Sequence, residues 1–80
     1  MKRELIIEKL TIIFRKVLNH DTLTLYDEMT ANDVDRWDSL SHMVLITEIE
    51  NSFSIRFKLK DLNKMRNVGE MIDIIISKLI

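Results

Sequence analysis

Residues 37–53 have the sequence WDSLSHMVLITEIENSF, and this stretch decides the fold. Apolar residues recur along it at helical spacing and predict a helix over residues 38–53. The predicted apolar stripe is Leu40, Met43, Ile46 or Thr47, Ile49 or Glu50, and Phe53. Asp38 is the expected N-cap and Ser39 the alternative, so the Ser39 hydroxyl lies in the first turn in either case. That position is exposed and close to the positive end of the helix dipole, which accommodates a phosphate or a phosphodiester.

Two more main helices are predicted, one on each side of this stretch. Residues 3–18 carry an apolar stripe at helical spacing, made of Ile6, Leu10, Ile13, Phe14, Val17 and Leu18. Residues 67–79 carry another, made of Val68, Met71, Ile72, Ile75, Ile76 and Leu79. Asn67 is expected to cap the last helix, and Glu70 to complete a capping box with it.

The two connecting segments differ in character. Residues 20–37 lack strong periodicity but hold too many apolar side chains for a free linker, so we expect this long loop to lie on the core; these side chains are Leu23, Leu25, Tyr26, Met29 and Val34. Residues 54–66 are expected to start as an extended segment and to continue as a helical turn over Asp61–Lys64. The sequence thus predicts an all-α, four-helix bundle with three main helices, one short helix and a long first loop.

Length and composition limit what such a bundle does. The chain has 80 residues, one glycine and neither proline nor cysteine, so we expect a single domain over residues 1–80 without disulfides, zinc fingers or thiol chemistry. The apolar runs are far too short for a membrane span, and the N-terminus lacks the pattern of a secretion signal, so we expect a cytoplasmic protein. A domain this small has few residues with which to enclose a substrate, so we expect no enzyme activity.

The net charge of −1 conceals an acidic middle. Residues 21–55 contain eight Asp or Glu and a single basic residue, Arg36. An acidic surface attracts basic partners and repels nucleic acid. The segment that holds Ser39 is therefore expected to bind proteins and not DNA or RNA.

The central motif, Trp37-Asp38-Ser39-Leu40-Ser41-His42, resembles the start of the second helix in the acyl carrier protein family. The resemblance extends over residues 3–79, through the Phe53 and Ile55 that follow this helix to the terminal stretch Val-Gly-Glu-Met-Ile-Asp-Ile-Ile. It implies a four-helix bundle with a long first loop. It also implies that Ser39 carries a 4′-phosphopantetheine arm, added from coenzyme A by a separate transferase. Asp38 corresponds to the acid of the motif and Leu40 to its core anchor.

The resemblance further implies a carrier that holds an acyl or aminoacyl group as a thioester on the arm and presents it to other enzymes. The expected partners are a phosphopantetheinyl transferase, a loading ligase and downstream synthases or transferases of fatty acid, polyketide or nonribosomal peptide biosynthesis. The residues expected to contact them are Trp37, His42, Met43, Glu48 and Glu50. For Trp37, anchoring the loop against the bundle is the favoured alternative, because large aromatic side chains usually bury most of their area. We expect a monomer that binds no metal.

The sequence departs from the family pattern near the motif. Many members have Gly-Leu or Gly-Phe before Asp-Ser-Leu, whereas this chain has Arg36-Trp37. Many have a strongly acidic second helix, whereas Ser41, His42 and Val44 occupy its early positions here. These differences favour a discrete carrier of a specialised pathway, or a peptidyl or aminoacyl carrier, over the general carrier of fatty acid synthesis.

Four other interpretations were compared with this one. A helical interaction module in which Asp38 and Ser39 only cap a helix fits the same composition. A Ser39–His42 hydrolase lacks a nearby glycine to build an oxyanion site. A calcium loop starting at Asp33 fails because its sixth and twelfth positions are Asp38 and Val44. A DNA-binding helix-turn-helix fails because residues 38–53 contain neither Lys nor Arg.

Several apolar residues outside the first and last helices could shelter an acyl chain or simply belong to the core. They are Met43, Ile55, Leu59, Leu62 and Met65.

Overall fold

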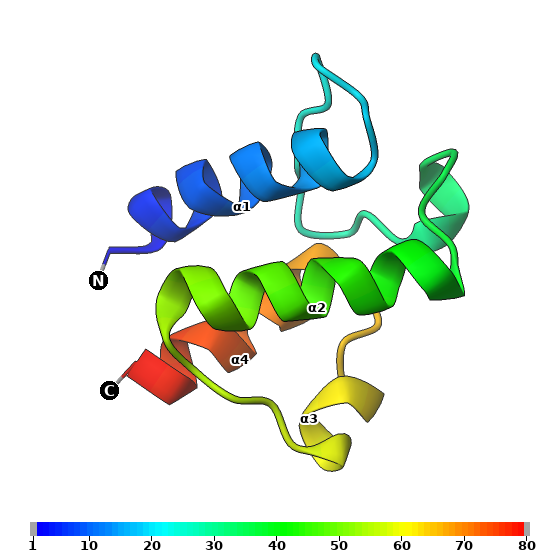
Figure 1. The fold of residues 1–80 in the computed structure, drawn as a ribbon. Coiled ribbons are helices and arrows are strands. Elements are labelled where there is room, and N and C mark those ends of the chain that lie inside the picture. The colour runs from blue at the N-terminus through cyan, green and yellow to red at the C-terminus, as the bar shows by residue number, and fades with distance from the viewer. Residues whose placement is uncertain (1, 80) are drawn as a thin grey trace.

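The fold is described by a computed structural model that covers residues 2–79. It contains α1 (Arg3–Val17), a 3-10 helix η1 (Ala31–Asp33), α2 (Ser39–Phe53), α3 (Leu59–Asn63) and α4 (Val68–Leu79) (Figure 1). α1 packs against both α2 and α4. The predicted all-α bundle, with three long helices, one short helix and a long first loop, is confirmed.

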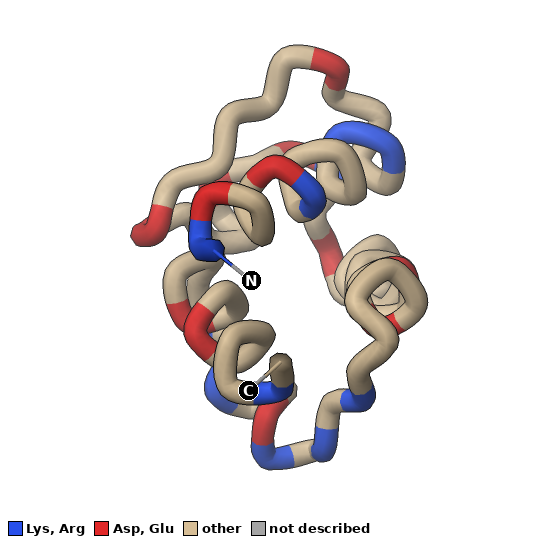
Figure 2. Tube along the Cα trace, turned by 90° about the vertical axis from the view of Figure 1, so that its left-hand side faces the viewer, with Lys and Arg blue, Asp and Glu red and all other residues tan. Residues whose placement is uncertain are grey.

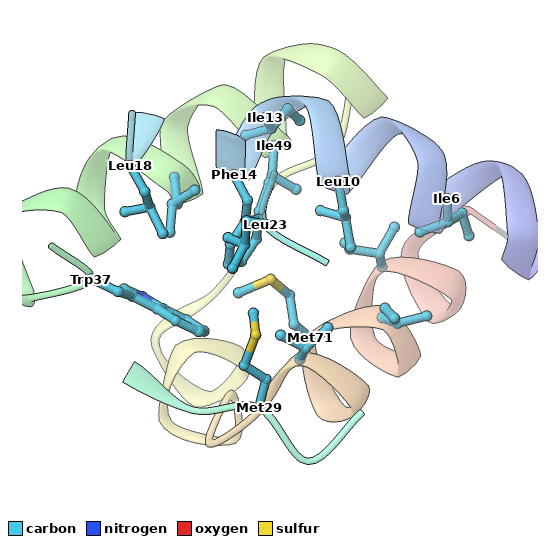
Figure 3. Close-up of a cluster of buried hydrophobic side chains, with 14 of the residues drawn as sticks. Ile6, Leu10, Ile13, Phe14, Leu18, Leu23, Met29, Trp37, Ile49 and Met71 are labelled. Carbon is cyan, nitrogen blue, oxygen red and sulfur yellow. The ribbon is translucent and has the colours of Figure 1, made fainter. Parts of the chain in front are cut away.

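One hydrophobic cluster joins the three long helices. α1 and α4 bury the stripes predicted for them, with Ile6, Leu10, Phe14, Val68, Met71 and Ile75 among the least exposed side chains. Figure 3 shows Met29 of the loop beside Met71 of α4, with Phe14 and Trp37 close by. Methionine fills irregular space well, and here it occupies the junction between the loop and the helices.

α2 buries the later part of the stripe predicted for it, Ile46, Ile49 and Phe53, but not its first two members. It buries Leu45, Ile46, Ile49 and Phe53, whereas Leu40 is 80% exposed and Met43 is 55% exposed. The expected burial of Leu40 and Met43 is therefore wrong. Both faces of this helix carry apolar residues, and the spacing alone does not tell which face meets α1.

The long first loop lies on the core, as predicted. Leu23, Met29, Val34 and Trp37 are buried, whereas Tyr26 is half-exposed. Arginines fasten the same loop to α1. Arg3 donates two hydrogen bonds to the Asp27 carboxylate at 2.8 and 2.9 Å, and Arg15 Nε donates to the Leu23 carbonyl at 2.8 Å.

The start of α4 touches the loop closely enough to favour a glycine. The backbone N–H of Gly69 donates to the Asp27 carbonyl at 2.9 Å, and that of Val68 donates to the Met29 carbonyl at 3.0 Å. A Cβ on Gly69 would lie 3.1 Å from Asp27 Cβ and 3.2 Å from the Asp27 carbonyl oxygen. The single glycine of the chain thus stands where a helix and a loop backbone meet.

The predicted cap of α4 is half confirmed. The Asn67 side chain accepts from the Glu70 N–H at 2.8 Å, as an N-cap should. The Glu70 carboxylate, however, accepts from Arg66 and not from the Asn67 backbone. Its predicted role in a capping box is therefore wrong, because an arginine one position before the cap attracts the carboxylate more strongly.

α3 begins two residues before the predicted turn over Asp61–Lys64. Asp61 organises it: the carboxylate accepts from the Lys58 N–H and from Lys78 Nζ of α4, each at 2.8 Å. The Lys78 ammonium, with help from the Lys58 N–H, holds the pKa of Asp61 below its ordinary value. Among the residues weighed as an acyl-chain shelter, Ile55 is buried in the core and Leu59 is exposed.

Replacing Gly69 by alanine is expected to lower the free energy of unfolding by about 1 kcal/mol. Overpacking against Asp27 costs roughly 1–3 kcal/mol, and the better helix propensity of alanine returns about 1 kcal/mol. Urea denaturation followed by circular dichroism measures the difference. Ser77→Ala, on the exposed side of the same helix, is the control and should stay within about 0.5 kcal/mol of the parent. An unchanged stability for Gly69→Ala would show that the loop backbone is not held against α4.

Candidate functional site

The start of α2 is fixed by a reciprocal pair of hydrogen bonds. The Ser41 N–H donates to Asp38 Oδ1 at 2.9 Å, and the Asp38 N–H donates to Ser41 Oγ at 2.9 Å. The Ser41 backbone N–H is the main reason why the pKa of Asp38 lies below its ordinary value. The prediction of Asp38 as N-cap is confirmed. Ser41 was not predicted as the capping-box partner of Asp38, because the third helical position of a capping box usually holds Glu or Gln and here holds a serine.

The residue before this cap pair adopts a backbone conformation that favours glycine. Arg36 has a φ of 73°, and its carbonyl accepts from Ser41 Oγ at 2.6 Å. Its guanidinium donates to the Asn19 carbonyl at 2.7 Å, just beyond the end of α1. The Arg36 side chain therefore adds a hydrogen bond to the end of α1 that a glycine could not make, and this bond offsets the strain of a left-handed residue.

Trp37 is buried and does not form part of an exposed partner face. Its side chain is 6% exposed, and its ring meets Phe14 edge-on with the centroids 5.1 Å apart. On the other side His42 stacks on the indole, and Trp37 Nε1–H donates to His42 Nδ1 at 3.1 Å. Of the two roles expected for Trp37, anchoring of the loop is confirmed, and contact with partners is wrong. A large aromatic residue next to an exposed motif anchors that motif by burying its own ring in the core.

Ser39 contrasts with Ser41, its neighbour two positions on. Ser39 is the first residue of α2 and is exposed. Within residues 2–79, no hydrogen bond engages its hydroxyl, whereas the Ser41 hydroxyl is held by the cap pair and by the Arg36 carbonyl. Ser39 lines an open groove, whose other lining residues are Ala31, Asn32, Trp37, Asp38, His42 and Met43.

The apolar residues after Ser39 form an exposed patch. Leu40, Met43 and Val44 all lie on the surface, with Leu40 the most exposed. The core-anchor role that the resemblance implied for Leu40 is wrong here, because Trp37 fills the corresponding place beneath the start of the helix. We call Leu40, Met43 and Val44 the α2 patch.

The two acids expected on the partner face have different surroundings. The Glu50 side chain is only 18% exposed, and its carboxylate accepts from the Phe57 N–H at 2.8 Å. Glu50 thus holds the segment that follows α2, and it is not available to a partner. Glu48 is half-exposed.

The geometry gives no support to a hydrolase or a metal site. His42 Nδ1 accepts from Trp37, and His42 makes no hydrogen bond to Ser39 within the described range. Residues 2–79 contain no cluster of three or more side chains suited to a metal ion. No helix in this range is long and apolar enough to cross a membrane.

Two substitutions at Arg36 separate the backbone strain from the side-chain bonds. Both Arg36→Gly and Arg36→Ala remove the bond to Asn19, but only glycine adopts a positive φ at low cost. Arg36→Gly is therefore expected to be more stable than Arg36→Ala by about 1 kcal/mol in urea denaturation. Equal stabilities would mean that residue 36 leaves the left-handed region in solution.

Comparisons with known proteins agree with this geometry. No protein-family model and no curated protein sequence matches the chain. Among solved structures, the chain is similar to the solution NMR structure of the holo acyl carrier protein from Geobacter metallireducens, with 46% sequence identity and a TM-score of 0.86. The match covers 91% of this chain and 84% of that chain. The chain therefore belongs to the acyl carrier protein family, whose members are non-catalytic carriers that hold acyl groups on a 4′-phosphopantetheine arm.

Proposed function

We propose that Ser39 is the residue to which the phosphopantetheine arm is attached. One observation carries this proposal: the Ser39 hydroxyl is exposed and unengaged at the first position of α2, while the cap beside it is complete without it. When bound, the arm supplies the terminal thiol on which an acyl or aminoacyl group is held as a thioester. The chain itself supplies a fixed attachment point.

The residues around Ser39 suit such a group. The start of a 15-residue helix places unpaired backbone N–H groups and the positive end of the dipole near a phosphodiester. The Asp38 carboxylate accepts a hydrogen bond from the Ser41 N–H, and this bond accounts for the low pKa of the carboxyl. The groove next to Ser39 offers apolar side chains, from Ala31, Trp37 and Met43, to the carbon chain of the arm.

A helical interaction module, in which Asp38 and Ser39 serve only as a cap, explains the site less well. Asp38 and Ser41 form the whole cap between them, so the Ser39 hydroxyl has no structural task. The holo state of the similar Geobacter protein also favours a carrier.

We propose that partner enzymes dock on the α2 patch through apolar contacts. The fully exposed residues of α2 are all uncharged: Ser39, Leu40, Met43, Val44, Thr47, Asn51 and Ser52. The exposed charges nearest in sequence after α2 are basic, and Figure 2 shows them along the segment that leads through α3. Apolar contact is less sensitive to salt than charge pairing, so docking should depend weakly on ionic strength.

The proposed partners are a phosphopantetheinyl transferase, a ligase that loads the acyl or aminoacyl group, and downstream synthases or transferases. The uncharged face of α2 supports a carrier that serves a specialised pathway with its own set of enzymes. Enzymes that recognise carriers with an acidic second helix would find no matching charges on this face, so the face discriminates against them.

Ser39→Ala is expected to abolish loading and to leave the fold intact, because its hydroxyl makes no hydrogen bond that the substitution could remove. The measurement is intact mass after incubation with coenzyme A and a broad-specificity phosphopantetheinyl transferase, together with the circular dichroism of each variant. Ser41→Ala is the matched control: it should be less stable, yet still gain one phosphopantetheinyl group. A folded Ser39→Ala variant that still gains this mass would place the attachment elsewhere.

Val44→Ser is expected to lower the kcat/KM of loading by the transferase about 5- to 10-fold, since it removes an apolar contact from the α2 patch. Asn51→Ser, an exposed and uncharged position near the far end of α2, is the control and should change little. Glu48→Lys should also change little at low salt. A strong loss for Glu48→Lys with none for Val44→Ser would show that docking depends on charge.

A further inference from the structure

The groove beside Ser39 has a polar group whose hydrogen-bonding state is set by Trp37. The indole Nε1–H donates to His42 Nδ1 at 3.1 Å, so this nitrogen must carry a lone pair. The imidazole is then neutral and bears its proton on Nε2. The Trp37 contact therefore fixes one tautomer of His42 and leaves Nε2–H as a donor.

Burial keeps His42 in this state. Its ring is half-buried and lies nearly parallel to the indole, with an interplanar angle of 16° and centroids 6.1 Å apart. Burial lowers the pKa of His42 below its ordinary value, which favours the neutral form near pH 7. The Nε2–H donor is thus present without a positive charge.

The same groove is lined by both His42 and the attachment residue. Ser39 and His42 are three residues apart on α2, a spacing that places side chains next to one another on a helix surface, and both line the groove. Asp38 is the only other ionisable residue in the lining, and its carboxylate is held by the Ser41 N–H. Neither Lys nor Arg lines the groove, so no cationic side chain there competes with His42 for a phosphodiester.

Resting on the proposed attachment at Ser39, we propose that His42 is a positioning residue for the arm. Its Nε2–H donates a hydrogen bond to a phosphodiester oxygen on Ser39 and holds the start of the arm in the groove against Trp37 and Met43. Phosphodiester oxygens accept strongly from N–H donors, and the donor here is held in place before the arm arrives. The free end of the arm remains available to partner enzymes.

Two substitutions of His42 test the functions of its two ring nitrogens separately. His42→Asn places an amide oxygen near the position of Nδ1, so it can accept from Trp37 while it lacks the outer donor. His42→Gln places an amide N–H near the position of Nε2, so it keeps the outer donor while it lacks the acceptor for Trp37. All proteins are loaded with the arm and checked by intact mass before any other measurement.

The readouts are the ³¹P resonance of the loaded proteins and, for the parent, the titration of His42 followed by NMR. Wild type and His42→Gln are expected to share a ³¹P shift, and His42→Asn is expected to differ from both. Loading should raise the pKa of His42, because a nearby anion stabilises the charged ring. Asp38 is present before and after loading, so the change reports the arm. The indole Nε1–H resonance tells whether each variant keeps the Trp37 contact.

The outcomes separate this proposal from the function on which it rests. If no arm is added to Ser39, both are overturned. If the arm is added but the ³¹P shift is the same in all three proteins and the His42 pKa does not move, Ser39 remains the attachment residue and His42 does not position the arm.

Discussion

Burial of the Trp37 indole is the contact on which the functional end of this molecule depends. The ring lies between Phe14 of α1 and His42 of α2, so a single side chain joins the end of the first loop to two helices. Edge-to-face aromatic pairs add about 0.5–1.5 kcal/mol beyond the area they bury. Because residue 37 is anchored, Asp38 can cap α2, and Ser39 is held at the surface without any bond of its own. An attachment residue needs this combination of a fixed backbone and an unengaged hydroxyl.

A long loop with little regular structure needs side-chain contacts to fix its path, and here three arginines supply several of them. Arg3 and Arg15 of α1 hold the loop at Asp27 and Leu23, and Arg36 returns to the end of α1. Gly69 then allows the loop to lie directly on the start of α4. Each contact restricts the path of the loop before it reaches Trp37. The position of Ser39 therefore depends on packing throughout the bundle and not on its own motif alone.

Much of the fold could be predicted from local signals. The three long helices, the cap at Asp38 and the ordered loop follow from apolar spacing and from side chains that act on neighbouring backbone groups. The exposed face of α2 could not be predicted, because Leu40 and Leu45 lie on different faces of a helix that is apolar on both. The burial of Trp37 was favoured because it is a large aromatic residue, but its contact with Phe14 could not be predicted. The inward role of Glu50 was hidden because it depends on the path of the chain after α2, where Phe57 donates to it. The left-handed backbone conformation of Arg36 was also not predicted. Many family members have a glycine at this position, and that glycine indicates a positive φ.

The arrangement suits a carrier that passes one cargo among several enzymes. A rigid attachment point and a flexible arm raise the effective concentration of the thioester at each partner, and the docking proposed for the small α2 patch keeps each contact modest. The central claim is that the phosphodiester forms at Ser39. A through-bond ³¹P–¹H correlation spectrum of the loaded protein tests it most directly. We expect a correlation to the Hβ protons of Ser39; a correlation to Ser41 or to any other serine would place the arm elsewhere.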